Sequence, residues 1–306
     1  MRAARLHEYG NLAGITVEEV EDPLPGEGEI SLRVQAAAVN PIDWKIAEGF
    51  LSGGQPLSGP RGIGVDVAGI VERVGPGVTG VAPGEALLGA PISPAFAELA
   101  LSRPELLVRK PPGVTWEVAG SLAVVAGTAY ATLARLDPKA GETLLILGAS
   151  GGVGSVAIQL AVARGVRVIG TAGQSKLEQL RALGAVPVAY GDGLAERLAE
   201  VAPDGVDAAL DASGHGELEA AIALAGGTQR VLTIASSAEA QALGVEFHAG
   251  GGGELLIAAL EEVLPLIEAG SFFFPIAGIY DLEQVGAALR ESEHGHPAGK
   301  LVIVPQ

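Results

Sequence analysis

Apolar and polar positions follow two different patterns along the chain. Over the first hundred residues, four short apolar-rich runs at 2–7, 16–21, 29–38 and 65–74 are separated by turns rich in glycine and proline. Short strands bounded by such turns predict a small β-barrel or sandwich. The uncharged stretch at 118–134 is rich in Ala, Gly and Thr, and we expect a buried helix there.

From about residue 115 the pattern changes to alternating strands and helices. Apolar strand candidates at 144–147, 166–171, 186–190, 206–211 and 230–235 alternate with helix candidates at 155–164, 175–183, 194–201 and 218–225. Repeated β–α units with apolar strands predict an α/β fold with a doubly wound parallel sheet, covered on both faces. From residue 271 the tail returns to strand-like runs, ending at 301–304. The α/β domain is therefore either inserted into the β domain or followed by a short return to it.

Charge and composition narrow the classes of partner. The chain of 306 residues has a formal net charge of −17, which argues against nucleic acid and against an anionic membrane surface. Residues 143–163 carry no charge, but glycines split them into a strand and a helix, so we expect no membrane span. No signal peptide is visible, and cysteine is absent. These features favour a cytoplasmic protein without disulfides, thiolate catalysis or cysteine-bound zinc.

The glycine-rich segment at 148–154 lies between the apolar run at 143–147 and the predicted helix. Such a strand–turn–helix unit directs a helix N-terminus at a pyrophosphate, and Gly151 allows the backbone to approach it closely. Gly154 allows the helix to pack against its strand. Because the strand, turn, helix and second strand follow in order, we interpret residues 149–154 as a dinucleotide site rather than a structural turn.

The end of the second strand indicates which dinucleotide binds. An Asp or Glu about 20 residues after the glycines would favour NAD by accepting hydrogen bonds from the ribose 2′-hydroxyl. Residues 170–176 contain no acid, whereas Ser175 and Lys176 can bind a 2′-phosphate. This favours NADP(H). The alternative is that Ser175 is a helix N-cap and Lys176 a solvated residue of the first turn.

Several segments together resemble the zinc-free quinone oxidoreductase branch, which includes zeta-crystallin, of the medium-chain dehydrogenase/reductase superfamily. They are residues 40–43 with Gly49, residues 64–69 and 74–78, residues 126–130, the glycine turn, residues 170–173, and Gly299 with Lys300. The resemblance implies a GroES-like β-barrel domain at 1–117 and 267–306, completed by the C-terminal tail. It also implies a Rossmann domain at 118–266 that binds NADPH in the cleft. The implied reaction is hydride transfer to a quinone or another α,β-unsaturated carbonyl.

The resemblance also implies roles for individual residues. The implied catalytic pair is Asn40, a candidate donor to the substrate oxygen through its amide, and Asp43, which would orient Asn40 or the nicotinamide ribose. The same Asn-Pro-x-Asp segment is ordinary turn and N-cap chemistry. The implied cofactor contacts are Ile42 and Thr128 near the nicotinamide, Ser150, Gly151, Gly152, Val153 and Gly154 at the pyrophosphate, Gly173, Ser175, Lys176 and Tyr190 around the 2′-phosphate, Ser213, Ile234, Ala235 and Ser236 along the remainder, and Lys300 reaching a phosphate from the tail.

The chain also departs from the family pattern. Residues 62–66 read Gly-Ile-Gly-Val-Asp where the zinc-dependent branch has Gly-His-Glu, and cysteine is absent, so we expect no metal. The tyrosine that often follows the glycine equivalent to Gly49 is replaced by Phe50 and Leu51. A non-catalytic NADPH-binding or sensing protein on the same fold is therefore the alternative function. The family often forms dimers through the edge of the Rossmann sheet, which implies a homodimer here.

Overall fold

The computed structural model describes residues 1–295, 297 and 299–305. The chain divides into two compact units, residues 1–124 with 256–306, and residues 125–255. The sequence predicts these boundaries at 117 and 267 instead. Helices α3 (Ala123–Leu136) and α9 (Glu254–Glu268) each cross a boundary, so no turn or change of composition marks the division.

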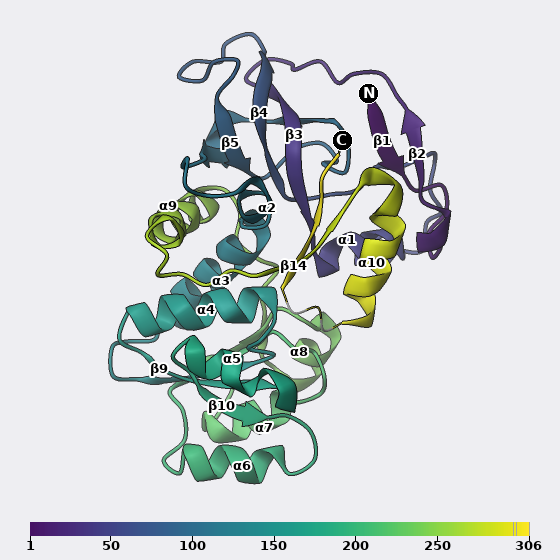
Figure 1. Ribbon diagram of the computed structural model, residues 1–306. Helices are drawn as coiled ribbons and strands as arrows, with labels where there is room; N and C mark the ends of the chain where they lie inside the picture. The colour runs from purple at the N-terminus through teal and green to yellow at the C-terminus, as the bar shows by residue number, and fades with distance from the viewer. Residues whose placement is uncertain (296, 298, 306) are drawn as a thin grey trace. The chain divides into compact units, whose positions relative to one another are not determined.

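The second unit is built around a parallel sheet (Figure 1). In the described chain this sheet has six strands in the order β10-β9-β8-β11-β12-β13, all paired in parallel. This is the strand order of a doubly wound dinucleotide-binding fold, so the predicted fold class is confirmed for this unit. The strands are β8 (Thr143–Leu147), β9 (Arg167–Ala172), β10 (Val186–Ala189), β11 (Ala208–Asp211), β12 (Val231–Thr233) and β13 (Glu246–Phe247).

Helices connect successive strands of this sheet. The helices that follow α3 are α4 (Gly152–Ala163), α5 (Leu177–Ala182), α6 (Leu194–Val201), α7 (Leu218–Leu224) and α8 (Ser237–Leu243). In α6, Leu194 and Leu198 are four residues apart and both buried, which is the spacing of one helix face. They pack with Leu145, Ile169 and other strand residues in one apolar core. Burial of the strand side chains explains why β8 is a continuous apolar run.

The described strands of the first unit pair antiparallel, except that β14 and β15 pair in parallel. Strands β1 (Arg2–Arg5) and β2 (Thr16–Glu19) form one pair. The larger sheet follows the order β14-β15-β3-β4-β5-β7, and β6 also pairs with β3. Its strands are β3 (Ile30–Val39), β4 (Val67–Val74), β5 (Ala86–Gly89), β6 (Leu99–Ser102), β7 (Leu107–Arg109), β14 (Ile276–Tyr280) and β15 (Lys300–Ile303). Because Leu301 of β15 pairs with Val39 of β3, the tail completes this sheet as predicted.

Short helices join the strands of the first unit. Besides α9, most of which belongs to this unit, its α-helices are α1 (Pro41–Ala47), α2 (Trp116–Ala119) and α10 (Val285–His294). The short 3₁₀ turns among the described residues of both units are η1 (Leu12–Gly14), η2 (Pro104–Leu106), η3 (Gln174–Lys176) and η4 (Leu282–Gln284). Helix α10 contacts α1 and β15, and Figure 1 shows α10 in yellow beside α1. The buried residues Val285, Ala288 and Leu289 of α10 join the core of this unit. The tail is therefore held by a helix as well as by its strands.

Three predicted elements differ from the structure. The helix expected at 118–134 begins at Ala123 and is preceded by the separate helix α2. Gly120 ends α2 where the backbone of β3 lies so close that a Cβ on Gly120 would be 2.4 Å from the carbonyl oxygen of Ala36. The helix expected from Ser175 begins at Leu177, after η3. In the tail, α10 stands where only strands were expected.

Candidate functional site

The glycine turn joins β8 to the first residues of α4. Gly151 is the N-cap of α4, with φ −73° and ψ 173°, and the helix begins at Gly152. The first N–H groups of an α-helix have no partner within the helix, and together with the helix dipole they favour an anion. A Cβ on Gly154 would lie 2.7 Å from the Cα of Ala149, so only glycine lets this helix pack so closely on its strand. The predicted residues of the turn are thus brought together at one helix N-terminus.

The turns after β8 and β11 lie against each other at the same edge of the sheet. Gly148 has a φ of +70°, and a Cβ there would lie 2.9 Å from the backbone nitrogen of Ser213. The buried carboxylate of Asp211 accepts hydrogen bonds from the Ser213 N–H and hydroxyl at 2.9 Å and from the Thr233 hydroxyl at 2.7 Å. Asp211 therefore fixes the ends of β11 and β12 relative to each other, a role that the sequence analysis missed.

The ends of β9 and β10 bring together the residues predicted around the 2′-phosphate. Ala172 of β9 pairs with Ala189 of β10, and these two residues are followed by Gly173 and Tyr190. A Cβ on Gly173 would lie 3.3 Å from the Tyr190 hydroxyl, so glycine keeps the space beside this tyrosine open. No acid occurs between Ala172 and Lys176.

Ser175 and Lys176 both lie in the 3₁₀ turn η3, before α5 begins. The alternative that Ser175 is the N-cap of α5 is wrong, because that position is held by Lys176 and no side-chain cap bond is formed. Ser175 is exposed, while Lys176 is partly buried, and burial lowers the pKa of the Lys176 ammonium. Both side chains are on the turn that follows β9.

The remaining predicted cofactor contacts of this unit are at the end of β12 and on α3. Ala235 N–H donates to the Thr233 hydroxyl at 3.0 Å, and the Ser236 hydroxyl caps α8 by accepting from the Glu239 N–H at 3.2 Å. Ile234 lies between these bonds, and its N–H donates to the Asp211 carbonyl at 2.9 Å. Thr128 on α3 is buried.

These residues fit a dinucleotide. The turn exposes a helix N-terminus at the middle of the sheet edge, and a Cβ on Gly151 would find its nearest neighbour, the Gly148 carbonyl oxygen, at 3.3 Å. In doubly wound sheets the ligand binds outside the carboxyl ends of the strands, where all of these turns lie. The sequence of the turn at 172–176 contains no acid, and the cationic Lys176 within it suits a second phosphate.

The predicted catalytic residues belong to a buried polar network in the first unit, formed by Asn40, Asp43, Asp66 and Lys300. Asn40 Nδ2 donates to Asp66 Oδ2 at 2.8 Å, and Asn40 Oδ1 accepts from Lys300 Nζ at 2.6 Å. Asn40 N–H donates to Asp43 Oδ2 at 2.8 Å. Side chains from the end of β3, the start of α1, the residue before β4 and the start of β15 therefore form one connected unit.

Asn40 uses its amide differently from the sequence prediction. Its two N–H groups are directed to Asp66 and to the Ala38 carbonyl at 3.3 Å, and its side chain is 1 % exposed. A lysine can only donate and a carboxylate can only accept, so the orientation of the amide is fixed by its partners. The amide is therefore engaged within the protein, and donation to a substrate oxygen would require one of these bonds to break.

Lys300 is also internal to this network. Its ammonium is buried and donates to the Val39 carbonyl at 3.0 Å as well as to Asn40. These partners differ from the phosphate that the resemblance implies. Ile42, the other predicted contact of this unit, is partly buried on α1, one residue before Asp43. Asp66 was missed by the sequence analysis, although an acid within the apolar run at 65–68 signals a buried polar contact.

The network holds two carboxylates and one ammonium. Burial raises the pKa of Asp43 to about 7, and the neighbouring Asp66 carboxylate raises it as well. Burial also raises the pKa of Asp66, opposed chiefly by the Lys300 ammonium and the Asn40 amide, and it lowers the pKa of Lys300. Asp43 Oδ1 is buried and forms no hydrogen bond within the described part of the chain. The Lys300 ammonium opposes the rise in pKa at both carboxylates.

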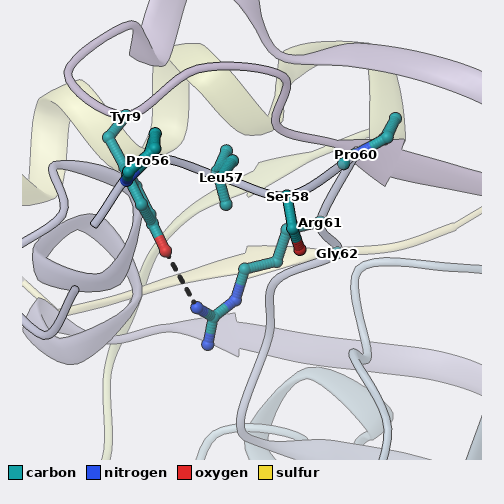
Figure 2. A pocket seen from close by; sticks show the side chains of 8 residues that line it. Tyr9, Pro56, Leu57, Ser58, Pro60, Arg61 and Gly62 are labelled. Atoms are coloured by element: carbon teal, nitrogen blue, oxygen red, sulfur yellow. Dashed lines mark hydrogen bonds between the residues drawn. The ribbon is translucent and has the colours of Figure 1, made fainter.

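A surface pocket of about 450 Å³ also lies in the first unit (Figure 2). It is lined by Tyr9 and residues 56–62, and the guanidinium of Arg61 donates to the Tyr9 hydroxyl at 3.2 Å. None of the predicted site residues lines it. We therefore assign it no part in the site.

The described residues contain no group of three or more His, Asp or Glu side chains placed to hold a metal ion. Among them, no helix is long and apolar enough to cross a membrane.

The fold and the glycine turn define a two-unit dinucleotide-binding oxidoreductase, and comparison with known proteins agrees. Residues 26–138 match the alcohol dehydrogenase GroES-like domain family, and residues 152–248 match the zinc-binding dehydrogenase family. The 2-methylene-furan-3-one reductase of Solanum lycopersicum is 32 % identical over 100 % of this chain and 79 % of its own length. The chloroplastic NADPH-dependent alkenal/one oxidoreductase of Arabidopsis thaliana is 32 % identical over 97 % of this chain and 78 % of its own. A mycobacterial protein solved in complex with NADPH has a TM-score of 0.87 and 28 % identity, with both chains covered fully.

The chain therefore belongs to the medium-chain dehydrogenase/reductase superfamily, in its zinc-free, zeta-crystallin-like quinone oxidoreductase branch. This confirms the resemblance drawn from residues 40–43, 64–69 and the glycine turn. It also confirms the GroES-like assignment of the β domain.

Replacing Asp43 by Asn should flatten the pH dependence of stability. An acid whose pKa is raised on folding stabilises the folded state fully below its unfolded pKa, and that stability is lost as pH rises through its folded pKa. With a folded pKa of about 7 and an ordinary value of 3.8, Asp43 lowers the free energy of unfolding as pH rises from 4 to 7. The slope due to this group is at most about 1.4 kcal/mol per pH unit.

Urea unfolding at several pH values between 5 and 7.5 measures this slope. The Asp43→Asn variant should lose less stability over the range than the wild type does. Exposed Asp204 provides the control, because Asp204→Asn should leave the wild-type slope unchanged. Parallel curves for wild type and Asp43→Asn would contradict the assignment.

Proposed function

We propose that this chain is a zinc-independent, NADPH-dependent oxidoreductase that reduces a quinone or another α,β-unsaturated carbonyl. The observation that carries the proposal is the acid-free turn after β9, with Ser175 and Lys176, beside the glycine turn that opens α4. The acceptor class rests on the family and on two relatives that are named as reductases of a furanone and of alkenals or enones.

The bound cofactor would supply the hydride, so that NADPH is oxidised to NADP⁺ while the acceptor gains the hydride and one proton from solvent. The residues of this chain would bind the cofactor and orient it. The α4 N-terminus at Gly152 and Val153 would hold the pyrophosphate through backbone N–H groups. Lys176, Ser175 and Tyr190 would hold the 2′-phosphate, by charge and by hydroxyl hydrogen bonds. The rest of the cofactor would contact Ser213, Ile234, Ala235, Ser236 and Thr128.

For Asn40, Asp43 and Lys300 we propose a positioning role. The amide of Asn40 bridges the ammonium of Lys300 and the carboxylate of Asp66, which sets the end of β3 and the first turn of α1. Ile42 in that turn would then contact the nicotinamide. A fixed backbone here contributes to rate by orienting the reactants, not by supplying a proton.

Lys176→Ala should weaken NADPH binding far more than NADH binding. The variant removes a charged contact worth about 1.5–3 kcal/mol, which is roughly a tenfold to hundredfold loss of affinity. Quenching of protein fluorescence on titration measures both dissociation constants. Lys139→Ala is the matched control, because Lys139 is exposed and paired with Asp137. An equal loss for both cofactors, or none, would overturn the 2′-phosphate assignment.

The activity is tested by following NADPH oxidation at 340 nm with a panel of quinones and enones. We expect acceptor-dependent oxidation by protein treated with a metal chelator, because no step requires zinc. The alternative is the non-catalytic NADPH-binding protein. Tight NADPH binding without acceleration by any acceptor would establish that alternative.

The proposal includes a cytoplasmic homodimer. The two-residue strand β13 is the last strand of the six-stranded sheet, and Phe247 on it is 42 % exposed. An unpaired edge with an exposed aromatic side chain suits pairing with a second copy. Analytical ultracentrifugation should therefore find a dimer for the wild type and a shift to monomer for Phe247→Asp. A wild-type monomer at micromolar concentration would exclude the dimer.

A further inference from the structure

His248 lies at the same edge of the sheet as the predicted cofactor contacts, although no role has been assigned to it. It follows β13 directly, and its N–H donates to the carbonyl of Thr233, the last residue of β12, at 2.9 Å. The position of His248 is therefore fixed at the carboxyl ends of the last two strands of the sheet.

The strand order indicates which half of a dinucleotide would lie near His248. The 2′-phosphate candidates follow β9 and β10, and the pyrophosphate turn follows β8. A dinucleotide that crosses the carboxyl edge from these strands must place its nicotinamide half beyond β8, towards β11, β12 and β13. From β8 to β13 there are three strand spacings, roughly 14 Å.

The segment after His248 is held against α3 by glycines. A Cβ on Gly251 would lie 2.3 Å from the carbonyl oxygen of Gly127, and one on Gly250 would lie 3.1 Å from Thr128 Oγ1. Larger residues at these positions would push the segment away from α3. His248 is thus two residues from a contact with Thr128, the residue predicted near the nicotinamide.

The imidazole has a ring nitrogen without a partner. Nε2 of His248 is buried and forms no hydrogen bond within the described residues, while the whole side chain is 22 % exposed. Nδ1 is 4.0 Å from Glu246 Oε1, too far for a hydrogen bond. Glu246 is instead bound by Arg135, at 3.1 Å from Nε and 2.7 Å from Nη2. Buried polar atoms in native proteins are nearly always satisfied, so an orphaned one at a ligand edge points to a ligand.

We propose that Nε2 of His248 hydrogen-bonds a carbonyl-bearing group at the nicotinamide end, either the carboxamide of the nicotinamide or the carbonyl of the acceptor beside it. The inference rests on the proposed function. Both groups carry a carbonyl oxygen that can accept a hydrogen bond from a ring N–H, and the carboxamide N–H can also donate to a ring lone pair.

The first arm of the test measures binding. His248→Phe keeps a ring but removes Nε2, while His248→Gln restores a polar nitrogen or oxygen at similar reach. Each variant is titrated with NADPH and with adenosine 2′,5′-bisphosphate, which lacks the nicotinamide half. If the partner is the carboxamide, His248→Phe should weaken NADPH roughly three- to tenfold and leave the bisphosphate unchanged, with recovery in His248→Gln. Lys176→Ala should weaken both ligands.

The second arm measures steady-state kinetics with the best acceptor at saturating NADPH. If the partner is the acceptor carbonyl, NADPH affinity is unchanged in His248→Phe, and kcat/KM for the acceptor falls roughly three- to tenfold and recovers in His248→Gln. His7→Phe is the control, because His7 is exposed in the other unit and should change neither measurement.

Two outcomes overturn the inference. One is unchanged NADPH affinity together with unchanged acceptor kinetics in His248→Phe. The other is an equal loss for NADPH and the bisphosphate with no recovery in His248→Gln, which assigns the residue a purely structural role. Failure of the proposed function is distinct from both, because the wild type would then bind no NADPH or turn over no acceptor.

Discussion

The contact between Lys300, Asn40 and Asp66 is the constraint on which the first unit depends. A buried ammonium and a buried carboxylate are each costly alone, and the amide of Asn40 satisfies both at once. These three residues come from the start of β15, the end of β3 and the residue before β4. The C-terminal tail therefore joins the sheet both by strand pairing and by the hydrogen bonds of Lys300 to Asn40 and to the Val39 carbonyl.

In the second unit the main constraint is the close packing of chain segments at glycine positions. Gly148, Gly154 and Gly170 occupy positions where a Cβ would lie under 3 Å from a neighbouring atom. These glycines let the turn and α4 pack closely on the sheet. Asp211 then holds the ends of the next two strands together through its hydrogen bonds to Ser213 and Thr233.

Much of this could be read from the sequence, for physical reasons. The continuous apolar run at 143–147 followed by glycines specifies a buried parallel strand and its turn, and the absence of an acid after β9 is a property of the sequence itself. Helix α10 was missed although Val285, Ala288 and Leu289 have helical spacing, because the short tail was compared with a strand pattern. The partners of Asn40 could not be predicted, because Asp66 and Lys300 are far from it in sequence and only strand pairing brings them together.

Asn40 and His248 differ in whether their polar atoms have hydrogen-bond partners within the protein. The sequence motif directs attention to Asn40, yet its amide has all of its hydrogens engaged inside the protein. His248 has no motif around it and follows a strand of only two residues, yet one of its ring nitrogens is buried and has no hydrogen-bond partner among the residues that the structure describes. A polar atom with its bonds complete holds the fold in place, whereas one with a bond left to make is free to recognise a ligand. In this chain Asn40, which lies in the sequence motif, is therefore suited to supporting the fold. His248, which lies in no motif, is suited to recognising a ligand.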